Sequence, residues 1–218
     1  MVEPYVTEGV AEYVLTLFKG FRGVCVDIGA YHPYWLNNSW IFEKIGWDTY
    51  CIEPNPNCIP KLKEERLHVL EYACGSINKD SVPLFVYKNS TVGEAGGTGI
   101  MNSPHRIRST DKWSFQEYIG KVSVNIRTLD WLMENEILEE NIDYLSIDVE
   151  NSEIDVLKGT DLARWKPKII VIENINEDDA QIQYLKDRGY RRVNRMIFND
   201  IYVLDEYYMK NLYVEGIS

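Results

Sequence analysis

Two short apolar runs, each followed by an acidic residue or a turn, constrain the fold of this chain more than any other feature. The first, Val24-Cys-Val-Asp-Ile28, leads into Gly29, and the second, Tyr50-Cys-Ile52, leads into Glu53, 24 positions after that glycine. This arrangement is typical of a β-α-β unit with parallel strands. There, a glycine lets the backbone approach a ligand, and an acidic strand tip accepts hydrogen bonds from ribose hydroxyls. The two segments therefore predict a nucleoside-binding sheet edge.

The turn after the first run indicates which nucleoside cofactor to expect. Gly29-Ala-Tyr-His-Pro33 supplies one glycine where a dinucleotide fold carries G-x-G-x-x-G. A ribose clamp without a pyrophosphate cradle favours S-adenosyl-L-methionine over NAD or FAD, which predicts a methyltransferase. Two alternatives stay open: a nucleotide-dependent oxidoreductase of related fold, and a catalytically inactive S-adenosylmethionine-binding regulatory or scaffold protein.

Composition narrows the class of protein and of partner. With 218 residues and 45% hydrophobic content, the chain can bury one sizeable core, so we expect a single domain over 1–218. A net charge of -11 disfavours nucleic acid and anionic membranes as partners, and favours a small neutral or cationic acceptor. Four cysteines without a C-x-x-C pair favour free thiols, a cytoplasmic setting and no structural zinc. Neither a signal peptide nor a membrane span of ~18 apolar residues is expected.

Hydrophobic periodicity predicts alternating helices and strands along the chain. A helix over 5–19 lies in an N-terminal helical segment, 1–22, and residues 89–121 are polar and rich in Gly and Ser, as in a lid or acceptor-binding insertion. Helices are also expected over 38–44, 57–66, 128–138 and 178–188, and another is expected to begin at Ser152. Strands are expected over 23–28, 48–52, 68–73, 82–87, 122–127, 143–148, 168–173, 190–197 and 201–204.

The end of the chain refines the fold class. The last two expected strands flank Asn199-Asp200, a favoured turn dipeptide, and therefore predict an antiparallel hairpin. Strand and helix alternation finished by a hairpin predicts an α/β fold with a mostly parallel seven-stranded sheet and helices on both faces. This is the Rossmann-like class I methyltransferase fold.

A longer motif resembles a known family. The stretch Asp143-Tyr-Leu-Ser-Ile-Asp-Val-Glu-Asn-Ser-Glu-Ile-Asp-Val-Leu-Lys-Gly159 is similar to the Ile-Asp-Val-Glu-Gly-x-Glu-x-x-Val-Leu-x-Gly signature of the FkbM family of S-adenosylmethionine-dependent methyltransferases. The loop ending at Pro33 resembles the family branch with a Gly-Ala-x-His-Pro loop, and the segments 52–56 and 170–173 also fit. The resemblance runs from about 23 to 174. One departure is Asn151, which stands where the family has Gly.

The loops and strand ends in these motifs supply the candidate cofactor residues. Glu53 is expected to clamp the ribose, and Asp27 to orient the glycine turn or to reach the methionine ammonium. Ser39 would donate to the methionine carboxylate or cap a helix, and His32 would contact the same carboxylate. Ala73, with Cys74, is expected near the adenine or in the core. The full predicted set is Asp27, Gly29, Ala30, Tyr31, His32, Ser39, Glu53, Pro54, Ala73 and Asp148.

Candidate catalytic residues follow from the chemistry of methyl transfer, an in-line displacement in which a base removes the acceptor proton. Asp148 and Glu150 follow the fourth strand of the predicted parallel sheet, and His105 lies in the lid-like insertion. The alternative is that Asp148 contacts the cofactor or the backbone, and that Glu150 only interacts with the positive end of the following helix dipole. Glu173 adds a third carboxylate, but without a recognisable ligand spacing no metal is expected.

The acceptor is predicted less sharply than the cofactor. We expect a hydroxyl on a small polar molecule such as a sugar or glycan precursor. Arg106 and Arg108 would bind an anionic acceptor or form a solvated loop face. The oligomeric state stays open, a homodimer included.

Overall fold

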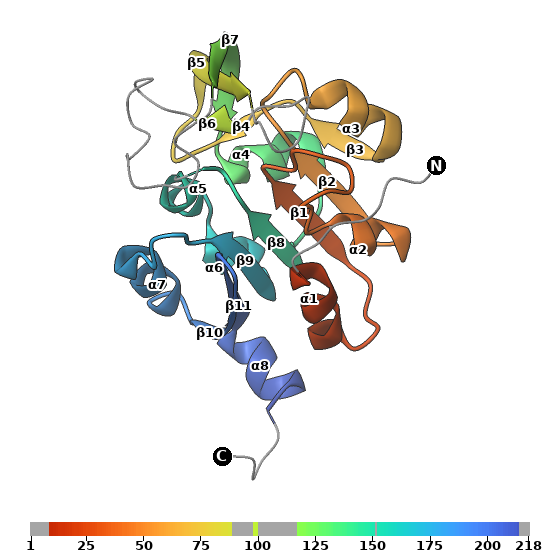
Figure 1. Cartoon of the computed structure of the whole chain (residues 1–218). Coiled ribbons are helices and arrows are strands. Elements are labelled where there is room, and N and C mark those ends of the chain that lie inside the picture. The colour runs from red at the N-terminus through yellow and green to blue at the C-terminus, as the bar shows by residue number, and fades with distance from the viewer. Residues whose placement is uncertain (1–8, 89–97, 100–116, 151, 214–218) are drawn as a thin grey trace.

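The computed structural model describes residues 9–88, 98–99, 117–150 and 152–213, and its centre is a seven-stranded sheet (Figure 1). The strand order is β10-β11-β9-β8-β1-β2-β3. Strands β3, β2, β1, β8 and β9 are parallel, whereas β11 runs antiparallel to both β9 and β10. The strands are β1 Val24–Ile28, β2 Asp48–Ile52, β3 His68–Leu70, β8 Tyr144–Ile147, β9 Ile169–Glu173, β10 Tyr190–Met196 and β11 Asn199–Leu204. The predicted mostly parallel sheet with a terminal antiparallel hairpin is confirmed.

Helices cover both faces of this sheet, as predicted, because buried side chains alternate along its strands. One face packs against α1 Val10–Phe18, α2 Trp40–Lys44 and α3 Ile59–Glu65. The other packs against α4 Leu129–Leu132, the π-helical turn η1 Met133–Ile137, α5 Glu153–Lys158, α6 Leu162–Trp165 and α7 Asp179–Lys186. In β1, for example, Cys25 joins the first core, whereas Val24 and Val26 join the second. The chain continues after β11 into α8 Asp205–Asn211, a helix that periodicity did not predict.

A second, smaller sheet corrects two predicted boundaries. Its order is β4-β7-β5-β6, formed by β4 Ala73–Cys74, β5 Lys79–Lys88, β6 Thr98–Gly99 and β7 Glu117–Arg127. The predicted strand 68–73 was wrong, because the central sheet keeps only β3, and β4 pairs with β7 instead. The predicted insertion 89–121 contains β6 and the first residues of β7, since ladder pairing with β5 extends β7 beyond its apolar part. The rest of that insertion, including His105, Arg106 and Arg108, lies outside the described residues.

The C-terminal hairpin turns two residues earlier than predicted. Its turn is Ile197-Phe198, and Asn199-Asp200 belongs to β11. The Asp200 carboxylate is fully buried and accepts hydrogen bonds from Arg195 Nη1 at 2.9 Å and Asn174 Nδ2 at 2.9 Å. A turn dipeptide therefore gave the wrong position, because Asp200 is a buried strand residue whose carboxylate requires the partners Arg195 and Asn174.

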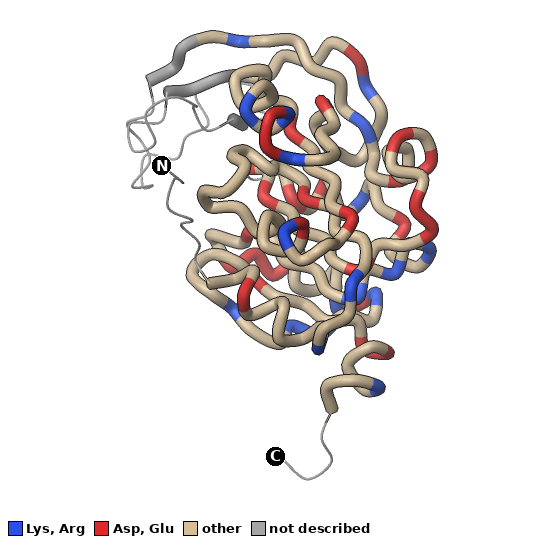
Figure 2. Tube along the Cα trace, turned by 90° about the vertical axis from the view of Figure 1, so that its right-hand side faces the viewer, with Lys and Arg blue, Asp and Glu red and all other residues tan. Residues whose placement is uncertain are grey.

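Positions of basic and acidic residues are mixed along the described backbone. Figure 2 shows Lys and Arg scattered among Asp and Glu in that view. Among the described residues, no helix has the length and apolarity that crossing a membrane requires.

Candidate functional site

Four neighbouring strands end in step at one edge of the central sheet. Pairing aligns an isoleucine from each strand in a single row, formed by Ile52, Ile28, Ile147 and Ile172. The residues that follow this row are Glu53, Gly29, Asp148 and Glu173. The chain leaves β1 toward β2 on one side and returns through β8 on the other, so the strand order reverses between β1 and β8. Open α/β sheets bind their ligands at such a reversal, beyond the carboxyl ends of the strands.

Gly29 lies at the strand reversal, where its Cα packs against the backbone at the end of β8. Its φ is 86°, and a Cβ placed there would lie 1.7 Å from the Asp148 carbonyl oxygen. Its amide donates to the Ile52 carbonyl at 2.9 Å, and the Ala30 amide donates to the same oxygen at 3.2 Å. Only glycine fits this position, because a side chain would meet both the αL penalty and the end of β8.

Glu53 presents a buried carboxylate one residue after β2. Its Oε2 accepts a hydrogen bond from the Tyr31 amide at 2.8 Å, and its Oε1 accepts one from the Asn55 amide at 2.8 Å. Burial raises the pKa of Glu53 to about 7 against the lowering effect of these two amides, with Asp27 and Glu150 raising it further. Each oxygen retains acceptor capacity for a ligand hydroxyl. Pro54, between Glu53 and Asn55, is half-buried.

Asp27 and Ser39, both predicted to serve the cofactor, are bonded to one another. The Asp27 Oδ2 accepts hydrogen bonds from Ser39 Oγ at 2.5 Å and Asn37 Nδ2 at 3.2 Å. Burial raises the pKa of Asp27, whereas the hydrogen bonds from Ser39, Ser146 and Asn37 lower it. The one proton of the Ser39 hydroxyl is thus directed at protein acceptors, and its side chain does not cap α2.

Asn37, which sequence reasoning missed, performs the capping. Its Oδ1 accepts hydrogen bonds from the amides of Ser39 at 3.0 Å and Trp40 at 2.7 Å. Its Nδ2 donates to the Ala30 carbonyl at 3.1 Å and to the His32 carbonyl at 3.1 Å. A single buried amide therefore organises the whole loop between β1 and α2. Its position one residue before the predicted cap at Asn38 or Ser39 was the only sequence signal.

His32 has a defined protonation pattern in this loop. Its Nδ1 accepts hydrogen bonds from the amides of Tyr34 at 3.2 Å and Trp35 at 3.1 Å, and its ring stacks on Trp35 at 4.6 Å between centroids. Because backbone amides can only donate, Nδ1 must carry a lone pair, and the neutral ring then has its proton on Nε2. This arrangement suits donation to an anion from Nε2 and does not suit a general base.

Tyr31 completes the loop beside Glu53. It adopts a φ of 50° and is half-buried. Burial, with the nearby Cys58, Glu53 and Glu150, raises the pKa of Tyr31 to about 12, so its hydroxyl stays neutral at physiological pH. Ala73 and Cys74 lie in β4 and are both buried, Cys74 within the larger core cluster. Core packing is therefore the role that the structure supplies for Cys74.

The acidic residues of the site divide into two groups. Asp148, Glu153 and Glu173 each offer a carboxylate oxygen, and the three oxygens lie within 4.8 Å of one another, a set that a divalent cation could use. Glu153 takes the place predicted for Glu150 and also accepts a hydrogen bond from the Val149 amide at 3.1 Å. Sequence reasoning missed Glu153, although it is the second glutamate of the strand-four motif.

Glu150 is not one of these three carboxylates. Its φ is 57°, and its charge contributes to the raised pKa values of Glu53 and Tyr31. Desolvation by the surrounding protein and the Glu153 carboxylate raise the pKa of Glu150 itself, so its charge acts on both sets of residues, and Glu150 is exposed to solvent. Asn151, the departure from the family signature, lies outside the described residues.

Comparison with known proteins fits this geometry. The model of the Methyltransferase FkbM domain matches residues 27–192. The chain belongs to the FkbM methyltransferase family. The match contains Glu53, the strand-four motif and Glu173, so the site described above lies inside the FkbM domain.

A solved structure gives a weaker comparison. Methyltransferase FkbM from Methylobacillus flagellatus KT, a crystal structure at 2.20 Å resolution, is similar at 14% sequence identity and a TM-score of 0.48. The similarity covers 92% of this chain and 45% of that one, so the present chain spans less than half of the length of that protein. A search of the curated proteins gave no match.

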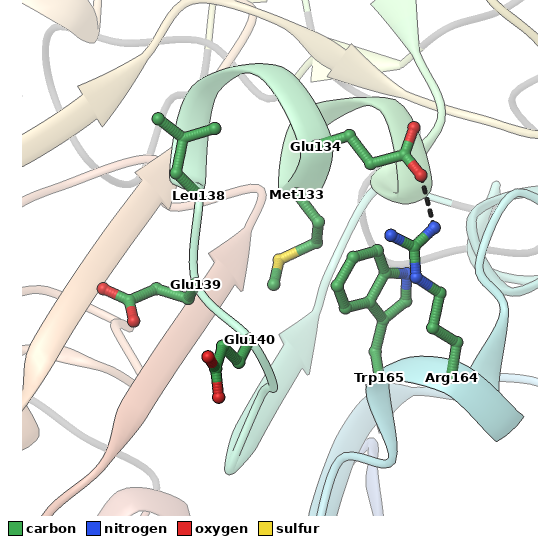
Figure 3. A pocket seen from close by; sticks show the side chains of 7 residues that line it. All are labelled: Met133, Glu134, Leu138, Glu139, Glu140, Arg164 and Trp165. Atoms are coloured by element: carbon green, nitrogen blue, oxygen red, sulfur yellow. Dashed lines mark hydrogen bonds and ion pairs between the residues drawn. The ribbon is translucent and has the colours of Figure 1, made fainter.

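A shallow hollow lies elsewhere on the FkbM domain. Figure 3 shows Glu134 and Arg164 forming an ion pair across it, and the Arg164 guanidinium lies 4.0 Å from the Trp165 ring centroid. The lining residues are Met133, Glu134, Leu138, Glu139, Glu140, Arg164 and Trp165. They precede β8 and β9 in the chain and therefore lie toward the amino ends of these strands, opposite the edge that carries Glu53 and Asp148.

Two glycines with left-handed backbones test the contact at the strand reversal. Gly20 has a φ of 82° with open space around its Cα, whereas Gly29 has a φ of 86° and faces the Asp148 carbonyl. Gly20→Ala should cost only the conformational penalty, about 1 to 2 kcal/mol. Gly29→Ala should cost clearly more, because β1 and β8 must also separate. Urea unfolding of both variants measures the difference, and equal losses would show that the Asp148 contact is unimportant.

Proposed function

We propose that this FkbM-family chain is an S-adenosylmethionine-dependent methyltransferase that methylates a hydroxyl of a small polar molecule, such as a sugar or glycan precursor. The observation that carries the cofactor assignment is the Glu53 carboxylate. It lies at the sheet edge beside the strand reversal, is fixed by two backbone amides and keeps acceptor capacity. A ribose diol offers two donors that match the two oxygens of such a group.

The surrounding loop supplies complementary groups for the rest of the cofactor. His32, with its proton on Nε2, is suited to donate to the methionine carboxylate. Asp27 and Ser39 are assigned an indirect role in cofactor binding, which is to support the loop. Their polar atoms form hydrogen bonds with each other and with Asn37. When bound, S-adenosylmethionine supplies an electrophilic methyl group on a sulfonium.

The acidic side chains set the chemistry of the acceptor. Asp148 lies with Glu153 and Glu173, whose carboxylates can accept hydrogen bonds from several hydroxyls of one molecule. Such a cluster repels anions, and a net charge of -11 acts in the same direction. A polyhydroxylated neutral acceptor fits these constraints. Asp148 or Glu150 would hold or remove the acceptor proton, with His105 as the loop alternative.

Cofactor choice is the first test. S-adenosylmethionine and S-adenosylhomocysteine should bind in calorimetry, and NAD should not. Glu53→Ala should weaken binding by about 1.5 to 3 kcal/mol, the range for hydrogen bonds to a charged group. Glu71→Ala removes an exposed carboxylate paired with Lys63 and should leave affinity unchanged. Equal binding of NAD would favour an oxidoreductase, and an unaltered dissociation constant in Glu53→Ala would remove Glu53 from the ribose site.

Affinity should also depend on pH. Because the pKa of Glu53 is raised to about 7, the carboxyl is mostly protonated at pH 6 and mostly ionised at pH 8. The ionised form accepts hydrogen bonds with both oxygens, so the dissociation constant should fall as pH rises through 7, by about tenfold between pH 6 and 8 if only that form binds. Glu53→Gln lacks this titration and corrects for titration of the ligand. Parallel pH profiles for the two proteins would contradict the assignment.

Catalysis is tested by removing each candidate base. A hydroxyl is a poor nucleophile at neutral pH, so loss of the base should cut turnover by about 10²- to 10⁴-fold. Asp148→Asn or Glu150→Gln should show this loss while cofactor affinity changes only a few-fold, and His105→Ala tests the loop alternative. Glu139→Gln, in the hollow at the opposite edge, is the control. Near-normal turnover in all three variants would show that this protein catalyses by proximity alone.

A further inference from the structure

Arg66 is a buried cation that no sequence motif indicated. It follows α3 directly, and its side chain is shielded from solvent although arginine is rarely buried without partners. Its Nε donates to Glu43 Oε2 at 2.9 Å, in an ion pair whose carboxylate is largely buried. Its Nη2 donates to Ser39 Oγ at 2.9 Å, and its Nη1 donates to the Pro33 carbonyl at 3.2 Å. The guanidinium fork therefore joins the end of α3 to two neighbouring segments, the loop between β1 and α2 and the helix α2 itself.

These partners belong to a different part of the chain from the segment that carries Arg66. Arg66 directly follows α3, and this helix comes after Glu53 and Asn55 in the chain. Pro33 and Ser39 belong to the loop between β1 and α2, and Glu43 belongs to α2. Arg66 thus connects the segment that bears the ribose-binding candidate to the loop that contributes Tyr31 and His32. Backbone hydrogen bonds join this loop to the strand before Glu53 at the strand ends, where the Gly29 and Ala30 amides donate to the Ile52 carbonyl.

The connection continues inward through hydrogen bonds. Ser39 Oγ, which accepts from Arg66, donates in turn to Asp27 Oδ2. Arg66 Nη1 also donates to Asn37 Oδ1 at 3.3 Å. Asn37 in turn donates to the carbonyls of Ala30 and His32, on either side of Tyr31. The Tyr31 amide binds Glu53. One path of polar contacts therefore runs from Arg66 through Asn37 to the loop backbone that fixes the Glu53 carboxylate.

We propose that Arg66 is a positioning residue for cofactor binding, which holds the β1–α2 loop against the α3 segment so that Tyr31, His32 and Glu53 form one site. This inference rests on the proposed function. Lysine cannot replace arginine here, because an ammonium group lacks the planar fork that reaches Pro33, Ser39 and Glu43 together. Both charges of the Arg66–Glu43 pair are buried, so removing one alone also destabilises the fold.

The experiment separates positioning from stability with four variants. Arg66→Lys retains a charge for Glu43, and Arg66→Met/Glu43→Gln removes both charges of the buried pair. Arg66→Met alone leaves Glu43 unpaired. Lys63→Met, in the helix that Arg66 follows, removes an exposed cation paired with Glu71 and is the matched control. Each variant is measured for thermal unfolding, for amide hydrogen exchange over 29–40 and for the dissociation constant of S-adenosylmethionine.

If Arg66 positions the loop, its variants should change thermal stability and affinity for S-adenosylmethionine independently. Arg66→Met should be the least stable variant, and the double variant should recover most of its melting temperature. The double variant and Arg66→Lys should nevertheless bind S-adenosylmethionine at least tenfold more weakly than the unmodified protein, with faster exchange over 29–40 and unchanged exchange in α1. Lys63→Met should match the unmodified protein in all three measurements.

Two results would overturn the inference. If Arg66→Lys or the double variant binds with unmodified affinity, Arg66 is only a structural residue. If exchange over 29–40 is the same in all variants, Arg66 does not hold the loop. Failure of the proposed function is distinguishable, because the unmodified protein would then not bind S-adenosylmethionine at all, and hydrogen exchange alone would decide whether Arg66 orders the loop.

Discussion

The site depends on the contact between Gly29 and the carbonyl of Asp148. This contact closes the gap between β1 and β8 at the point where the strand order reverses, with no room for a Cβ. The turn must therefore leave β1 with a left-handed residue, and the loop that follows is directed over β2 toward Glu53. The same contact fixes the start of the segment that carries Asp148 and Glu150. A ligand at this edge consequently meets groups from both halves of the sheet at fixed separation.

Sequence reasoning correctly predicted the features that depend on the order of residues within single strands and motifs. Glu53 and Asp148 each follow an apolar strand and Glu173 ends one, and parallel strands bring such residues to one edge, so their convergence could be predicted without knowing any side-chain contact. The sheet and its layers followed from the same periodicity, and the strand-four motif indicated the family. These features depend on residues within a few positions of one another.

Several residues that were misplaced or missed depend on partners in other elements of the fold. Asp200 was placed in a turn because its preference for one is local, whereas its burial depends on Arg195 and Asn174. Arg66 lies 27 positions from Ser39 and 23 from Glu43, and no periodicity marks it as buried. Glu153 was overlooked beside Glu150 because a helix N-terminal acid ordinarily needs no further role. Charged residues in helical segments are usually exposed, and that average conceals the few that are not.

The buried polar groups around Asp27 show why the loop carries so many polar residues that a ligand need not touch. A loop of aromatic and polar residues between β1 and α2 has no regular backbone pairing, so its carbonyls and amides require side-chain partners when buried. Asn37 and Arg66 provide these partners, and Asp27 balances Arg66 through Ser39. A sequence motif therefore contains residues that support the loop as well as residues that would face a ligand, because both kinds are needed for the same geometry. In this chain Glu53 lies at the sheet edge where the nucleoside is proposed to bind, whereas Asp27, equally prominent in the motif, holds in place the loop from which the Tyr31 amide donates to Glu53.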